Sequence, residues 1–63
     1  MAVTDIELLD AFESFDEEGV HSRLLLAKLL DKGYETSSIV NTLYALIDQG
    51  VLAVGITGKV QRP

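Results

Sequence analysis

Few side chains in this 63-residue chain could carry catalytic or metal chemistry, and their spacing does not bring them together. His21 is the single histidine and there is no cysteine, whereas a metal site needs several ligands close together. A lone histidine beside Ser22 is more typical of a loop or a helix cap. The segment Gly55–Lys59 places a lysine after a glycine but lacks the spacing of a phosphate-binding loop. No nucleophile is accompanied by a general base. We therefore expect no catalytic residue, no metal and no cofactor, and we do not expect an enzyme.

Carboxylates are the most abundant ionisable groups, and they cluster at one end of the sequence. Residues 1–18 carry seven acidic side chains and no basic one, whereas all five Lys and Arg residues lie within 19–63. The net charge of −5 would normally repel nucleic acid. Two explanations stay open. The acids form a solvated helix face that aids solubility, or they lie away from a mildly basic working face.

Length and composition bound the class of protein. Residues 1–63 suffice for one domain, and a hydrophobic content of 48% is high enough for a compact core. The first residues carry no Lys or Arg, which does not fit a secretory signal. The longest purely apolar runs, Leu24–Ala27 among them, are far too short to span a membrane. We expect a single cytoplasmic domain with no membrane partner.

Hydrophobic periodicity predicts a first helix near the N-terminus. Thr4 and Glu7 have the spacing of a capping box, which satisfies free backbone N–H groups at a helix start. Apolar residues then recur at helical spacing on one side: Leu8, Leu9, Phe12 and Phe15. The polar run 16–19 is expected to end the helix and form a loop.

Two more helices are expected in the middle of the chain. The second is predicted between a cap at Ser22 and a left-handed stop at Gly33, and the third between a cap at Thr36 and a similar stop at Gly50. The third helix has a clean apolar stripe: Ile39, Val40, Leu43, Leu46 and Ile47. Its other residues are expected to face outward, with Tyr44 at the border: Ser37, Ser38, Asn41, Thr42, Ala45, Asp48 and Gln49.

The C-terminal residues are typical of a β-hairpin. Residues 51–54 are apolar and partly β-branched, which favours a strand. Residues 55–58 have the composition of a turn, and 59–62 could return as the partner strand. Residues 20–21 are a candidate for a short extended piece before the second helix. The predicted fold class is therefore α+β, with three helices followed by a short C-terminal hairpin.

This succession of elements resembles the winged helix-turn-helix superfamily. The resemblance covers about residues 4–62 and is carried by the short joint at Gly33–Glu35 and by the run Asp48–Leu52, where a helix passes through a glycine into an apolar strand. It implies a winged-helix-like domain in which the third helix enters the DNA major groove and the hairpin, or wing, contacts the backbone or minor groove.

Carried over to this chain, the resemblance implies a small transcription regulator that binds double-stranded DNA. Because the chain has few cations, we expect it to act as a dimer, which would double the contacts. The third helix would present five polar or small side chains: Ser37, Ser38, Asn41, Thr42 and Ala45. The Ser and Thr hydroxyls can bond bases or phosphates, and Asn41 can pair with adenine. Lys59 and Arg62 would be the wing cations, and Arg23 would contact a phosphate.

One departure from that pattern leaves a second hypothesis for the function open. The predicted third helix has no Lys or Arg, and phosphate neutralisation supplies most non-specific DNA affinity. The alternative is a protein-interaction module on the same fold, which associates with itself or docks a larger transcription or replication complex. Its surfaces would be two tyrosines and the acidic first helix: Tyr34, Tyr44, Asp10 and Glu13.

Overall fold

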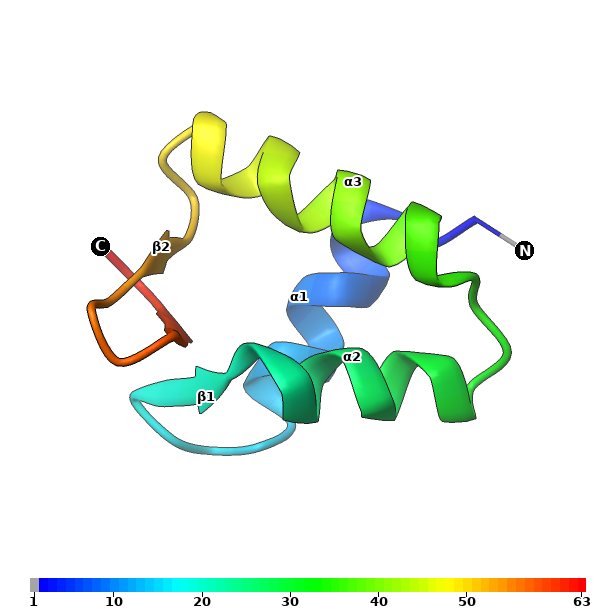
Figure 1. Cartoon of the computed structure of the whole chain (residues 1–63), viewed down its shortest axis with the longest axis horizontal. Coiled ribbons are helices and arrows are strands. Elements are labelled where there is room, and N and C mark those ends of the chain that lie inside the picture. Colours follow the sequence, from blue (N-terminus) through cyan, green and yellow to red (C-terminus); the bar gives the residue numbers. More distant parts are fainter. Residues whose placement is uncertain (1) are drawn as a thin grey trace.

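Three helices and three short strands form residues 2–63, which the computed structural model of the chain describes (Figure 1). The elements are α1 (Asp5–Glu13), β1 (Gly19–His21), α2 (Ser22–Asp31), α3 (Thr36–Asp48), β2 (Ala53–Val54) and β3 (Lys59–Gln61). The predicted α+β class with three helices is confirmed, and the structure adds a third strand to the expected hairpin. None of the helices within residues 2–63 has the length and apolar character needed to cross a membrane.

The three strands form one antiparallel sheet in the order β1-β3-β2. β3 is the central strand, so Val60 pairs with Val20 on one side and with Val54 on the other. Val20 and Val60 are fully buried, which fixes the register because a slip by one residue would turn both side chains outward. The extended piece expected at residues 20–21 is thus confirmed as part of β1. The two hairpin strands are shorter than the predicted 51–54 and 59–62.

Local hydrogen bonds explain where α1 begins and ends. The Glu7 N–H donates to Thr4 Oγ1 and the Thr4 N–H donates to the Glu7 carboxylate, so the predicted capping box is confirmed. The helix ends at Glu13, before the predicted stop at 16–19. The Ser14 hydroxyl donates to the Ala11 carbonyl, which satisfies an acceptor at the helix end.

The predicted caps of α2 and α3 are each wrong by one residue. His21 caps α2, and its Nδ1 accepts the Arg23 N–H at 3.3 Å. Ser22 is instead the first helical residue. Glu35 occupies the cap position of α3, with no side-chain cap bond, and Thr36 begins that helix. A chain entering from β1 already places His21 in extended geometry, which is what a cap position requires.

Both predicted glycine stops are confirmed, and each lies in a left-handed conformation, Gly33 at φ 96° and Gly50 at φ 78°. After α3, the Val51 N–H donates to the Leu46 carbonyl and the Gly50 N–H donates to the Ile47 carbonyl. This is the Schellman arrangement, and the same pair of bonds follows α2. Each glycine therefore turns the chain back over the apolar face of its helix.

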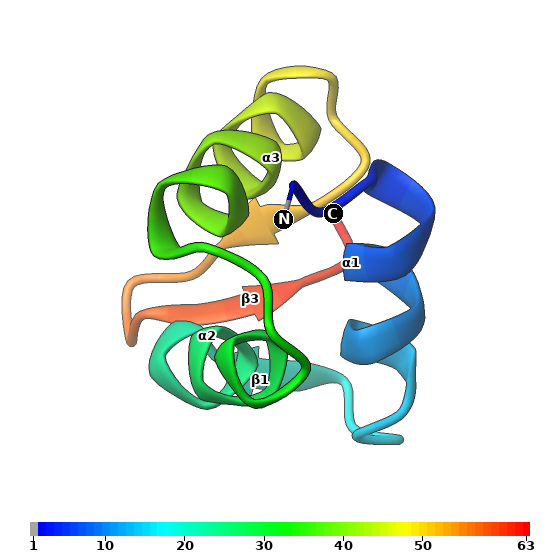
Figure 2. The same cartoon turned by 90° about the vertical axis from the view of Figure 1, so that its right-hand side faces the viewer.

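The core lies between the three helices and the sheet (Figure 2). Its largest fully buried side chains come from every element except β2: Leu8, Leu25, Leu29, Ile39, Leu46, Leu52, Val20 and Val60. The helices contact one another in all three pairs, and the sheet closes one end of the helical layer (Figure 1). Because α1 covers only one side of the α2–α3 pair, the opposite side of that pair faces solvent.

A matched pair of isoleucines tests this assignment of the core. Ile39 is 2% exposed and Ile56 is fully exposed at the hairpin turn. Ile39→Val should lower the free energy of unfolding by about 1 kcal/mol, because a buried methylene is lost and a small void remains. Ile56→Val should change it by less than about 0.5 kcal/mol. Urea unfolding followed by circular dichroism measures both, and equal effects would contradict the packing.

Candidate interaction surface

An apolar groove of about 450 Å³ lies between α2, α3 and the hairpin. Its floor and walls are formed mainly by Leu, Ile and Val side chains: Leu25, Leu26, Ile39, Val40, Leu43, Ile47 and Val54, with His21, Ser22, Arg23, Tyr44 and Gly58 completing the lining. Figure 1 shows the two helices that form its long walls and the sheet at one end. α1 lies behind that helix pair in this view, so the groove opens on the face away from α1.

Backbone hydrogen bonds hold the hairpin against the helices and so shape the end of the groove. The Ser22 N–H, at the start of α2, donates to the Gly58 carbonyl of the hairpin turn at 3.3 Å. The turn itself is closed by bonds between Gly55 and Gly58 and between Gly55 and Lys59. At the other end of the hairpin, the bonds around Gly50 fix the path from α3 into β2. The groove is therefore built from regular elements, which makes its geometry stable.

Exposed apolar side chains extend the groove onto the surface. Tyr44 is 65% exposed and Val54 is 48% exposed, and both belong to the lining. Isolated apolar side chains are ordinary on a protein surface, but two exposed ones that line an apolar depression make it a candidate binding site.

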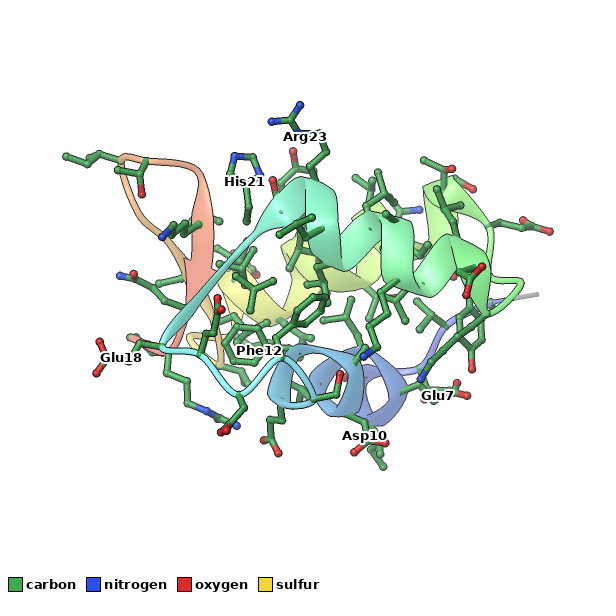
Figure 3. All side chains as sticks on the ribbon, turned by 90° about the horizontal axis from the view of Figure 1, so that it is seen from below. Glu7, Asp10, Phe12, Glu18, His21 and Arg23 are labelled. Atoms are coloured by element: carbon green, nitrogen blue, oxygen red, sulfur yellow. The ribbon has the colours of Figure 1, made fainter. Side chains whose placement is uncertain are left out.

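The charge around the groove differs from that of the whole chain. The chain carries ten acidic residues, yet no carboxylate belongs to the groove lining, which contains Arg23 and His21. In Figure 3, His21 and Arg23 project on one side of the molecule, and Glu7 and Asp10 of α1 lie on the opposite side. Glu7 and Asp10 thus lie away from Arg23, and both explanations of the N-terminal acids, a solvated helix face and a position away from a basic face, are compatible with this arrangement.

The residues predicted to face outward on α3 do not all do so. Ser37 and Asn41 are exposed, as are Ala45 and Asp48. Ser38 and Thr42 are half-buried, and the outward position expected for them is wrong. The Val3 N–H donates to Ser38 Oγ at 2.7 Å, and the Thr42 hydroxyl donates to the Val3 carbonyl at 3.2 Å. These two side chains, one helical turn apart, hold the N-terminal segment against the core.

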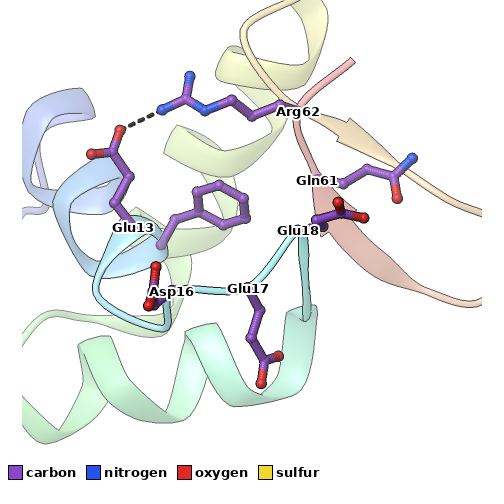
Figure 4. A pocket seen from close by; sticks show the side chains of 7 residues that line it. Glu13, Asp16, Glu17, Glu18, Gln61 and Arg62 are labelled. Atoms are coloured by element: carbon purple, nitrogen blue, oxygen red, sulfur yellow. Dashed lines mark hydrogen bonds and ion pairs between the residues drawn. The ribbon is translucent and has the colours of Figure 1, made fainter.

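Of the residues predicted as cations for DNA binding, some form ion pairs with other described residues and others do not. Arg62 donates to the Glu13 carboxylate, and this ion pair spans a shallow acidic depression between α1 and β3 (Figure 4). Both side chains of the pair are more than half exposed, so solvent weakens it. Among residues 2–63, neither the Arg23 guanidinium nor the Lys59 ammonium has an ion-pair partner. These two cations are therefore the ones available to a ligand near the groove and hairpin.

The remaining lysines lie on other parts of the helical layer. The Lys28 ammonium donates to the Ser14 hydroxyl and lies 4.9 Å from the centre of the Phe15 ring. It thus stabilises the end of α1, where a helix dipole favours a positive charge. Lys32 is exposed in the cap position after α2 and acts electrostatically on Glu7. No group of three metal-ligating side chains occurs in the described part of the chain.

Of the two tyrosines predicted as interaction residues, only Tyr44 is largely exposed. The half-buried Tyr34 packs on the core and donates its hydroxyl hydrogen to the Glu7 carboxylate, which ties the α2–α3 joint to the start of α1. That hydrogen bond, followed by those from Thr4, lowers the pKa of Glu7 below its ordinary value. The same bond raises the pKa of Tyr34. Asp10, predicted as part of an acidic docking face, is exposed on α1.

The sequence predicted apolar residues that line the groove, but it did not predict the groove itself. Val40, Leu43 and Ile47 belong to the apolar stripe predicted for the third helix, and they are half-buried in the structure, as is Leu26 on α2. Of the same stripe, Ile39 and Leu46 are buried in the core. Comparison of the chain with models of protein families, with curated proteins and with solved structures finds no match.

The Tyr34–Glu7 bond gives a pH-dependent contribution to stability whose sign can be tested. Because the pKa of Glu7 is lowered from 4.5 in the folded state, its contribution is present above that value and is lost as the pH falls through the lowered pKa. Tyr34→Phe should therefore destabilise the protein at neutral pH, and the difference from wild type should shrink in acid. Urea midpoints across that range measure the effect. The matched Tyr44→Phe should change little at either pH, and a Tyr34→Phe deficit that grows in acid would contradict the assignment.

Proposed function

We propose that this chain is a winged-helix domain whose function is to bind a protein partner in the groove between α2, α3 and the hairpin. The order of elements and the strand order β1-β3-β2 support the winged-helix assignment, in which β2, β3 and their turn form the wing. The second helix and the third are joined by a short segment around Gly33, as in a helix-turn-helix. Function on such a fold depends on its exposed surfaces.

The apolar groove is the single observation that carries the choice of a protein partner. Its volume lies within the range of ligand-binding pockets in proteins, and its lining is mainly apolar. Burial of apolar surface is the main favourable term in most protein association. Tyr44 adds an exposed aromatic ring at the rim, and tyrosine is enriched among residues that dominate binding energy. A duplex, whose surface is lined by phosphates, would leave this groove empty.

A crosslinking experiment in the source cell tests this proposal. Replacing Tyr44 by the photoreactive residue benzoylphenylalanine places a crosslinker at the rim of the groove. We expect irradiation to give one discrete protein conjugate, which the additional change Val54→Asp should abolish. The same crosslinker at the exposed Leu24, which is absent from the groove lining, is the matched control and should not give that conjugate. No conjugate at position 44, or a conjugate with nucleic acid alone, would contradict the proposal.

Duplex DNA is a second candidate, favoured by the exposure of Ser37 and Asn41 on α3 and by the free cations Arg23 and Lys59. An asparagine on an exposed helix can form two hydrogen bonds to adenine. However, α3 carries no cation and ends in Asp48. Two cations would release about two counterions, so binding would be weak and would fall with about the second power of the salt concentration.

A salt titration against random-sequence duplex DNA separates the two candidates. If the groove is the working surface, fluorescence anisotropy should show no saturable binding at physiological salt, and the double variant Asn41→Ala/Lys59→Ala should crosslink its protein partner like wild type. Tight binding that this double variant loses, and that Tyr44→Ala retains, would favour DNA instead.

A further inference from the structure

The groove also indicates the chemistry of its partner. We propose that it receives an acidic amphipathic helix, whose apolar side chains fill the groove and whose carboxylates meet Arg23. This inference rests on the proposed function, because it names the class of protein segment that the same site would bind.

The charge of the groove lining favours an acidic partner segment. Arg23 is exposed at the start of α2, belongs to the lining and has no ion-pair partner within residues 2–63. His21 lies next to it, and no carboxylate belongs to the lining. The acids of the chain are concentrated in residues 1–18, and Glu7 and Asp10 of α1 lie on the other side of the molecule (Figure 3). Charge complementarity of this kind selects partners and their orientation more than it adds affinity.

The shape of the groove carries the choice of a helix. Its long walls are α2 and α3, and an amphipathic helix can place apolar side chains at every third or fourth residue into such a channel. An extended segment would instead pair with the free edge of the sheet. The edge strand at the groove, β2, contains two residues, Ala53 and Val54, and offers too few backbone groups for strand addition.

A second copy of this chain fits the groove less well. Its α1 is acidic and has one strongly exposed apolar side chain, Ile6, but Leu8 and Phe12 of that helix are buried in its own core. One side chain cannot fill a groove of this volume. Two copies placed groove to groove would oppose two concave surfaces, and the cavity between them would stay unfilled.

Synthetic peptides test the inference directly. Three fluorescent peptides of about four helical turns share one leucine face and differ on the polar face, which is glutamate-rich, glutamine-rich or lysine-rich. In anisotropy titrations against the whole chain, we expect the acidic peptide to bind most tightly. This preference would oppose the net charge of −5, so non-specific attraction cannot produce it.

Arg23→Glu should weaken the binding of the acidic peptide by about threefold to tenfold, while Arg23→Gln should give an intermediate affinity.

Variants inside and outside the groove lining show whether the peptides bind in the groove. Tyr44→Ala should weaken all peptides by about tenfold, and Leu24→Ala, a truncation outside the groove lining, should have no effect. Equal binding of the acidic and neutral peptides, still weakened by Tyr44→Ala, would overturn the acidic preference and leave the proposed function intact. No peptide binding, together with a protein conjugate at position 44, would overturn the amphipathic helix alone. Sedimentation that shows a dimer dissociated by Tyr44→Ala would assign the groove to a second copy and overturn the inference.

Discussion

The pairing of β3 with a strand on each side is the constraint on which the rest of the molecule depends. Val60, at its centre, is fully buried and opposes Val20 and Val54. β1 leads directly into α2, and β2 follows α3, so one strand fixes the positions of both helices relative to the hairpin. A two-stranded hairpin alone would be marginal in water. The third strand explains why such a short hairpin holds its place and can form one end of a groove.

Intramolecular bonds engage three of the seven polar side chains that a DNA-binding interpretation would use. Ser38 and Thr42 hold Val3, and Arg62 pairs with Glu13. What is left at the groove is an apolar lining in which, among residues 2–63, Arg23 is the one charged side chain, with His21 next to it. In a small domain, a polar side chain that holds a terminus or a loop in place is not available to bind a ligand. The proposed partner is therefore inferred from the apolar surface that the fold leaves uncovered.

Local signals in the sequence predicted much of the fold. The capping box at Thr4 and the stops at Gly33 and Gly50 depend on neighbouring residues only, and they are confirmed. The caps of α2 and α3 were displaced by one residue because the incoming chain, rather than the best capping side chain, sets the position. The groove could not be predicted, because a periodic apolar stripe does not show which of its residues another element covers. The roles of Ser38 and Thr42 likewise depend on a contact with Val3, far away in the sequence.

The central claim is that the face between α2, α3 and the hairpin is the working surface. NMR of the isotope-labelled chain, which follows its methyl and backbone amide signals as the partner identified by crosslinking or the acidic peptide is added, tests it most directly. The account predicts that signals of Leu26, Leu43 and Val54 move together and saturate with the same affinity, while those of Ile6 and Leu24 stay unchanged. Movement of the Ile6 signal alone would place binding on α1. Unchanged groove signals beside shifted Ser37 and Asn41 amides would place it on the outer face of α3, and either result would contradict the account.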